Sequence, residues 1–185
     1  DAGRVVWDGW DGQDYEVFSA NADGSGLVQI TSNATASGKR RDDEWPRITP
    51  QGRVVWMGYD GSDWEVYSAP ATGGTIVALT NNSYDDEFPT VGGEWVAWHA
   101  RLTEGNTEVF AAPASGGSVA RLSNNTGEDL WPQINASGSI VWMNHDGSDW
   151  EIILGAATNA ATTVRITTNL THDQYPQITT AGRVV

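Results

Sequence analysis

The sequence has no cysteine, few basic residues and no long apolar run. Without cysteine, a disulfide framework, a thiolate zinc site and a cysteine nucleophile are all excluded. Only 10 Lys and Arg residues oppose 24 Asp and Glu residues, which gives 185 residues a formal net charge of −14. A chain this acidic is repelled by nucleic-acid phosphates and anionic lipid surfaces. No apolar run reaches the roughly 18 residues of a membrane-spanning helix. We therefore expect no nucleic-acid partner and no membrane insertion.

The sequence also has none of the motifs on which common catalytic sites are built. No long stripe of apolar residues at helical spacing occurs, so no helix of consequence is expected. The three histidines, His99, His145 and His172, do not have the spacing of a zinc site. Neither a Gly-x-Ser-x-Gly elbow nor a Gly-rich phosphate loop is present. The sequence therefore predicts that the chain is not an enzyme and carries no cofactor, calcium being the one exception considered below.

A short segment that ends in tryptophan occurs four times and is the strongest pattern in the chain. The copies are Arg4–Trp7, Arg53–Trp56, Trp95–Trp98 and Ser139–Trp142, and a fifth begins at Gly182. Their tryptophans are 49, 42 and 44 residues apart. With 39% hydrophobic residues and ten tryptophans, the chain is too apolar for an acidic disordered segment. Long repeats of this period indicate a solenoid, a propeller or an array of folded units.

Each repeat is predicted to form four short strands. In the second copy these strands span residues 46–49, 53–57, 64–69 and 75–80, with Pro46 opening the first and Asp60-Gly61 marking a hairpin. A four-stranded unit of this length buries both faces only against neighbours, which favours an all-β β-propeller with four-stranded antiparallel blades. A sandwich would not repeat its sequence, and a β-helix would have shorter repeats. The units span about residues 3–46, 46–89, 89–132 and 132–176, and a fifth starts at 176–185.

The ends of the chain bear on whether the four repeats close a ring. Pairing of residues 176–179 with Arg4–Trp7 would supply the first blade's missing strand and close a four-bladed propeller. Residues 183–185 would then duplicate Arg4-Val5-Val6. We therefore expect the repeats to belong to a larger ring, or to a homo-oligomer that completes the ring, because exposed strand edges invite pairing.

The repeat resembles a known family. The pattern aromatic-Pro-x-Ile-x-x-x-Gly-x-Val-Val-Trp, then Asp-Gly-Ser-Asp-Trp-Glu-Val-Tyr, then Gly-Gly and Leu-Thr-Asn-Asn, is similar to the WD-like β-propeller repeat of the TolB type. The resemblance covers essentially the whole chain and implies a propeller that serves mainly in binding. The chain departs from the family pattern in the Trp that ends the second strand and in Thr49-Pro50-Gln51-Gly52, which replaces the usual Ser-Pro-Asp-Gly turn.

Aromatic and acidic residues near the predicted hairpins are candidates for a binding surface. An aromatic ring stacks on a ligand face while a carboxylate accepts hydrogen bonds from hydroxyl groups, a combination that suits a protein or glycan partner. The alternative is structural, since these aspartates can fasten the hairpin through bonds to backbone amides. The candidate binding residues are Trp10, Tyr59, His145, Asp11, Asp60 and Asp146.

Two further sets of acids repeat once per unit. One set, Glu16, Glu65, Glu108 and Glu151, lies on the predicted third strand. We interpret these acids as partners between strands or blades, with Arg4, Arg53 and other strand arginines as candidate partners, and the alternative is that they face a ligand. The second set lies three residues before a proline and is expected at one mouth of the central channel. Such carboxylates either form turns by bonding to backbone amides, the interpretation that we favour, or hold a hard cation such as calcium. This candidate metal set is Asp43, Asp86, Asp129 and Asp173.

The sequence thus predicts a non-catalytic binding or scaffolding propeller of an exported protein. The acidic charge, the Asn-rich loops and the lack of cysteine favour an extracytoplasmic location, periplasmic, secreted or at the cell surface. Two alternatives stay open. The blades could be the recognition or gating domain of a hydrolase or polysaccharide lyase whose catalytic part lies outside this chain, or they could form a glycan-binding lectin.

Overall fold

The computed structural model describes residues 3–33 and 41–185, and every regular element within them is a β-strand. These residues accordingly include no helix that is long and apolar enough to cross a membrane. The strands fall into four antiparallel sheets, each built from one sequence repeat. The strands are β1 (Arg4–Trp10), β2 (Tyr15–Asn21), β3 (Val28–Gln29), β4 (Asp43–Ile48), β5 (Arg53–Tyr59), β6 (Trp64–Pro70), β7 (Val77–Ala78), β8 (Asp85–Gly92), β9 (Trp95–Thr103), β10 (Asn106–Pro113), β11 (Ala120–Arg121), β12 (Asp129–Ile134), β13 (Ser139–His145), β14 (Trp150–Ala156) and β15 (Asn159–Arg165).

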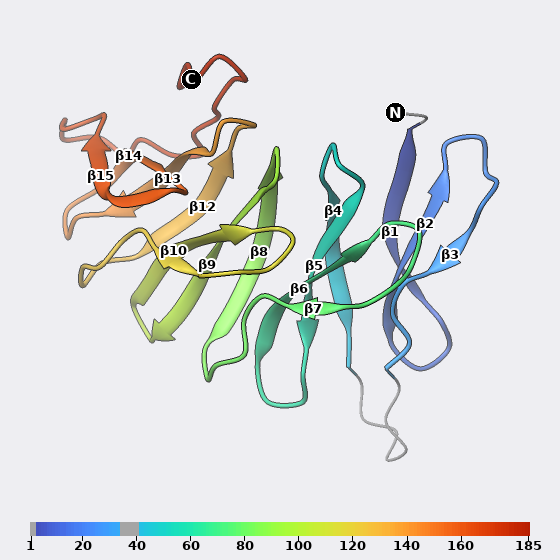
Figure 1. Ribbon diagram of the computed structural model, residues 1–185. Helices are drawn as coiled ribbons and strands as arrows, with labels where there is room; N and C mark the ends of the chain where they lie inside the picture. Colours follow the sequence, from blue (N-terminus) through green and yellow to red (C-terminus); the bar gives the residue numbers. More distant parts are fainter. Residues whose placement is uncertain (1–2, 34–40) are drawn as a thin grey trace.

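The four sheets are blades that stand side by side in chain order (Figure 1). Each complete blade has its strands in sequence order, for example β4-β5-β6-β7, and each strand pairs with the next through a hairpin. The first strands of neighbouring blades lie against one another, β4 against β8 and β8 against β12, and these inner strands are where the blades converge. The predicted all-β propeller architecture of antiparallel blades is therefore confirmed, with three strands instead of four in the first blade.

The hydrophobic core lies between the faces of successive blades. The repeated tryptophans Trp56, Trp98 and Trp142 are at most 1% exposed, and each packs among β-branched and alanine side chains of two blades. Trp7, which stands at the same place in the first repeat, is 37% exposed. In the described part of its sheet no inner strand precedes β1, so one side of the Trp7 indole is uncovered.

The inner strands differ from the sequence prediction. They begin at Asp43, Asp85 and Asp129 rather than at the proline, so Pro46 lies inside β4. The expectation that proline opens the strand is wrong because each inner strand is interrupted at this point by a shift in register, between Glu44 and Arg47 in β4. Proline is tolerated there because the strand is at a sheet edge and bulged.

The row of blades is open, and the first and last sheets lie at its two ends (Figure 1). Closure through residues 176–179 and Arg4–Trp7 does not occur. Ile178 instead bridges Val184, and the backbone groups of Gln177 and Val185 exchange two hydrogen bonds of 2.9 and 3.0 Å. These residues form the start of a fifth hairpin, with the same pairing as the first two strands of the other repeats.

Candidate functional site: an aromatic row on the inner strands

One aromatic residue in each repeat has a left-handed backbone conformation. Trp45, Phe88, Trp131 and Tyr175 have φ angles of 57°, 52°, 55° and 55°, and they are the only described non-glycine residues with positive φ. A bulky residue with this backbone is an outlier, and the conformation costs on the order of 1–2 kcal/mol per residue. Strain of this kind that recurs in every repeat points to a function for the side chain.

The conformation follows from two fixed points on either side of the aromatic residue. In β4, Asp43 is held by the buried indole of Trp56, whose Nε1 donates to Asp43 Oδ1 at 2.7 Å. Pro46 then fixes its own φ and has no N–H group to donate. Because the strand resumes its pairing at Arg47, the register shift includes Trp45. The side chain of Trp45 is turned away from the blade core and is 47% exposed.

The aromatic side chains of three blades touch one another and form a continuous row. The ring centroids of Trp45 and Phe88 are 5.3 Å apart, and those of Phe88 and Trp131 are 5.0 Å apart. His99 packs beneath, 5.5 Å from Phe88 and 5.7 Å from Trp131. Tyr175, at 66% exposure, holds the same position in the next repeat. The row lines a groove of about 300 Å³ together with Arg47, Pro89, Thr90, Pro132 and Gln133.

The imidazole that packs against Phe88 and Trp131 is neutral. His99 is 4% exposed, and burial, together with the nearby Arg101, lowers its pKa to about 4, so its imidazole is uncharged at neutral pH. Burial raises the pKa of Glu87 although the Arg101 guanidinium lies 3.1 Å from its carboxylate. The aromatic rings therefore pack on an uncharged side chain, and Arg47 is the one charged residue among the described residues that line the groove.

Three of the four residues of the predicted metal set are buried in the inner strands and bonded to neutral donors. In Asp43, Asp86 and Asp129, Oδ1 accepts the indole N–H of the blade's core tryptophan at 2.6–2.7 Å, and Oδ2 accepts an asparagine side-chain N–H at 2.6–2.7 Å. Burial raises the pKa of Asp43 to about 7 and that of Asp129 to about 6. Asp173 is half-buried and accepts from Asn169 at 2.5 Å. The donors are thus side chains and not the backbone amides that we expected, and a calcium ion at these acids stays a prediction.

The repeated glutamates connect one blade to the next. Glu65, 1% exposed on β6, accepts the backbone N–H of Asn82 at 2.6 Å, and the side chain of Asn82 donates to Asp86 on the next blade. Glu16 and Glu108 bond in the same way to Asn33 and Asn125. The predicted role between blades is therefore confirmed. Of the predicted partners, Arg4 and Arg53 donate to Ser19 and Ser68 instead. Two other strand arginines do pair with these acids, Arg121 with Glu108 and Arg165 with Glu151.

The predicted binding residues lie at three separate hairpins. Trp10, Tyr59 and His145 each contact, ring edge to face, the aromatic residue that follows the turn, at 5.0–5.6 Å. Asp11, Asp60 and Asp146 each accept two backbone amides of their own turn, as the structural alternative requires.

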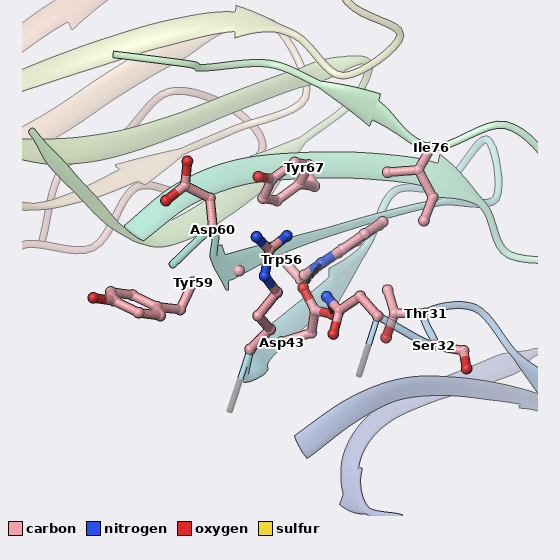
Figure 2. Close-up of a pocket in the computed structure, with 11 residues that line it drawn as sticks. Thr31, Ser32, Asp43, Trp56, Tyr59, Asp60, Tyr67 and Ile76 are labelled. Atoms are coloured by element: carbon pink, nitrogen blue, oxygen red, sulfur yellow. Dashed lines mark hydrogen bonds between the residues drawn. The ribbon is translucent and has the colours of Figure 1, made fainter. Parts of the chain in front are cut away.

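Two of these hairpins border cavities. Tyr59 and Asp60 share a cavity of about 240 Å³ with Asp43, and His145 and Asp146 line a second cavity of about 600 Å³. Figure 2 shows Asp43 and Trp56 at the centre of the first cavity, with Tyr59 on one side and Thr31 on the other. The structure thus brings one candidate metal ligand together with two candidate binding residues, and keeps the other hairpins apart.

The aromatic row was not among the predicted site residues. The signal for it was present, because each repeat carries the pattern Asp-x-aromatic-Pro. What the pattern does not reveal is the backbone angle that turns the aromatic side chain outward, since this depends on a hydrogen bond to a tryptophan about a dozen residues further along the chain.

Comparison with known proteins identifies the fold through solved structures alone. No family model matches the chain, and no curated protein matches it. The chain is similar to a protein described as TolB from Agrobacterium tumefaciens (TM-score 0.64, 15% identity, covering 96% of this chain and 67% of that one). It is also similar to TolB from Acinetobacter baumannii, with a TM-score of 0.67 and 17% identity, over 97% of this chain and 45% of that one. A puromycin-hydrolyzing peptidase from Mycobacterium tuberculosis matches as well, with a TM-score of 0.66 and 10% identity, over 89% of this chain and 27% of that one.

These likenesses define the chain as a set of β-propeller blades, and the particular propeller they resemble is the TolB type, as the repeat pattern predicted. At 10–17% identity the likeness concerns the fold. The chain spans two thirds of the first structure, less than half of the second and about a quarter of the third.

Proposed function

We propose that the chain is a non-catalytic binding module of an extracytoplasmic protein, and that its aromatic row binds an extended peptide segment of a protein partner. The observation that carries this proposal is the row itself: aromatic residues with a strained backbone stand at the same place in successive repeats and contact one another from blade to blade. Trp45 and Trp131 are exposed, and Phe88 is half-buried between them. Exposed aromatic side chains that are held rigid bind partners at low entropic cost. The acidic, cysteine-free composition supports the location.

The arrangement of the rings favours a peptide over a glycan. Sugars stack on flat, open aromatic faces, whereas the planes of Trp45 and Phe88 meet at 75° and those of Phe88 and Trp131 at 38°. Such a surface presents clefts between edges and faces, which suit branched or proline side chains. Pro89 and Pro132, which also line the groove, add further apolar surface to it.

Binding can be tested with peptides selected from a random display library on the intact chain and then measured by titration calorimetry. Trp45→Ala and Trp131→Ala should each weaken the selected peptides by about tenfold or more, as expected for aromatic hot spots. Trp10→Ala is the matched control, since Trp10 is 53% exposed at a hairpin remote in sequence from the row, and it should leave affinity unchanged. Equal loss in the control, or a library from which the intact chain selects no peptide, would contradict the proposal.

A second candidate function is the recognition domain of a peptidase or other hydrolase. The likeness to a puromycin-hydrolyzing peptidase favours it, and peptide binding at the row suits either role. The complete coding sequence distinguishes the two, because a nucleophile elbow of the α/β-hydrolase type in the same polypeptide would support the hydrolase.

A further inference from the structure

Three carboxylates gather at the hairpin between the second and third strands of two repeats. The groups are Asp11, Asp14 and Glu16 in the first blade and Asp146, Asp149 and Glu151 in the fourth. In each group one oxygen from every residue lies within 4.8 Å of the others. The aspartate of the turn is exposed, whereas the other two side chains are almost fully buried, Asp14 at 1% and Glu16 at 0% exposure.

In the first blade, each buried carboxylate has one oxygen bonded and one without a partner. Asp14 Oδ2 accepts the backbone N–H of Arg41, and Glu16 Oε1 accepts that of Asn33, both at 3.1 Å. Asp14 Oδ1 and Glu16 Oε2 are buried and have no hydrogen-bond donor in the structure described. Charged oxygens that are withdrawn from water and left unpaired are costly, and here two of them belong to one cluster of three acids.

In the fourth blade an arginine contacts two of the three acids. Arg165 Nη2 lies 3.1 Å from Glu151 Oε1 and also donates to Asp146 Oδ2. In the third blade Arg121, at the same register position, reaches Glu108 at 2.9 Å. The first blade has a neutral glutamine there, because Gln29 pairs with Phe18 as Arg165 pairs with Ile153. The same three acids thus face an arginine in one blade and no arginine at that position in the other.

We propose that Asp11, Asp14 and Glu16 bind one Ca²⁺ ion, which does in the first blade what the Arg165 guanidinium does in the fourth. The donors are oxygen atoms only, which selects a hard cation, and Ca²⁺ accepts irregular oxygen geometry and completes its shell with water at the exposed Asp11 side. The other blades are not equivalent. Asp60, Asp63 and Glu65 do not come within the same distance of one another, and the third blade has Asn106 in place of the central aspartate. One ion per chain is therefore expected.

Calcium calorimetry and terbium luminescence on the whole chain test this site directly. Tyr15 lies between two of the ligands in sequence, and the ring of Trp10 is 5.5 Å from it, so both can sensitise a bound Tb³⁺ ion. The wild type should bind one ion with saturable luminescence that calcium displaces and a chelator removes. Glu16→Gln should weaken binding by about tenfold or more, as loss of a charged ligand does.

Two substitutions, each of which gives one blade the residue that the other blade has at the equivalent position, separate a loss of binding from a folding defect. Gln29→Arg places the fourth blade's guanidinium in the first blade and should abolish binding while leaving the melting temperature at or above that of the metal-free wild type. Arg165→Gln should open the fourth cluster and raise the stoichiometry to two. The absence of binding in the folded wild type would overturn the proposal. So would undiminished binding by Gln29→Arg, which would place the ion elsewhere, with the acids of the inner strands next to be tested.

Discussion

Asp129 is a buried acid whose environment consists of neutral donors. Its two oxygens accept from the indole of Trp142 and the amide of Asn125, both at 2.6 Å, and these bonds favour the ionised form. Desolvation by burial outweighs them, and the charge of Glu108 acts in the same direction, so that the pKa of Asp129 rises to about 6. The proton on this residue is therefore bound more tightly in the folded chain than in the unfolded one.

The first prediction concerns the pH dependence of stability. Because the folded pKa of about 6 exceeds the unfolded value of 3.8, protonated Asp129 stabilises the fold at low pH, and this contribution is lost as the pH rises from about 4 to about 6. Asp129→Asn removes the titrating group. The unfolding free energy of the wild type minus that of the variant should therefore decrease as the pH rises through this range, as measured by urea denaturation at a series of pH values. A difference independent of pH would contradict the assignment.

At the scale of the element, the inner strand carries a residue type that its backbone disfavours. Trp45, with φ of 57°, occupies the conformation that glycine adopts without strain. Its counterparts Phe88 and Trp131 have the same geometry, and all three are followed by proline. The left-handed conformation therefore destabilises the strand, and it directs the aromatic side chain outward.

The second prediction compares two truncations at this position. Trp45→Gly and Trp45→Ala both remove the ring, but only glycine relieves the left-handed strain, so the glycine variant should be more stable by about 1 kcal/mol in urea denaturation. Val5 is the control, since it is exposed on β1 and has no positive φ. There the alanine variant should be the more stable of the pair. An alanine variant at position 45 as stable as the glycine variant would mean that the strain is absent.

The sequence predicted some elements well and others poorly, for physical reasons. The strand over residues 53–57 was predicted because it is rich in β-branched and aromatic residues and precedes the hairpin signal Asp60-Gly61, and the structure extends it to Tyr59. The start of β4 was missed because a proline within a sheet is expected at the first residue of a strand. The hydrogen bond between Asp43 and Trp56, which holds the strand before Pro46, joins residues that are 13 positions apart. The aromatic row was missed for the same reason: the conformation of Trp45 depends on packing between strands that residue spacing does not encode.

At the scale of the whole molecule, a repeated chain of hydrogen bonds ties each blade to the next. Between the second and third blades it runs from Glu65 through Asn82 to Asp86, and ends at the buried indole of Trp98. Each of these residues is supplied by a different part of the repeat. The blades are therefore coupled by polar contacts as well as by the tryptophan core between them.

The third prediction is that Asn82→Ala uncouples these two blades. The variant leaves one oxygen of the buried Asp86 carboxylate without a donor, which should cost about 1–3 kcal/mol of unfolding free energy. Asn169→Ala is the matched control, because its acceptor Asp173 is only half-buried and the loss should be smaller. Urea denaturation followed by tryptophan fluorescence measures both variants. Equal losses would show that burial of the acceptor does not matter.

The strand order within the blades has a consequence for how the chain acquires its structure. In every complete blade each strand pairs with the strand that follows it, so that no sheet requires a segment from a distant part of the chain. Sheets with such local pairing form quickly, since little loop entropy is lost before contacts are made. The strands of a blade such as β4 to β7 can therefore begin to pair as soon as their own residues have emerged from the ribosome. The blade becomes stable only when it packs on the next one and Trp98 is buried between them, because one unit cannot bury its faces alone.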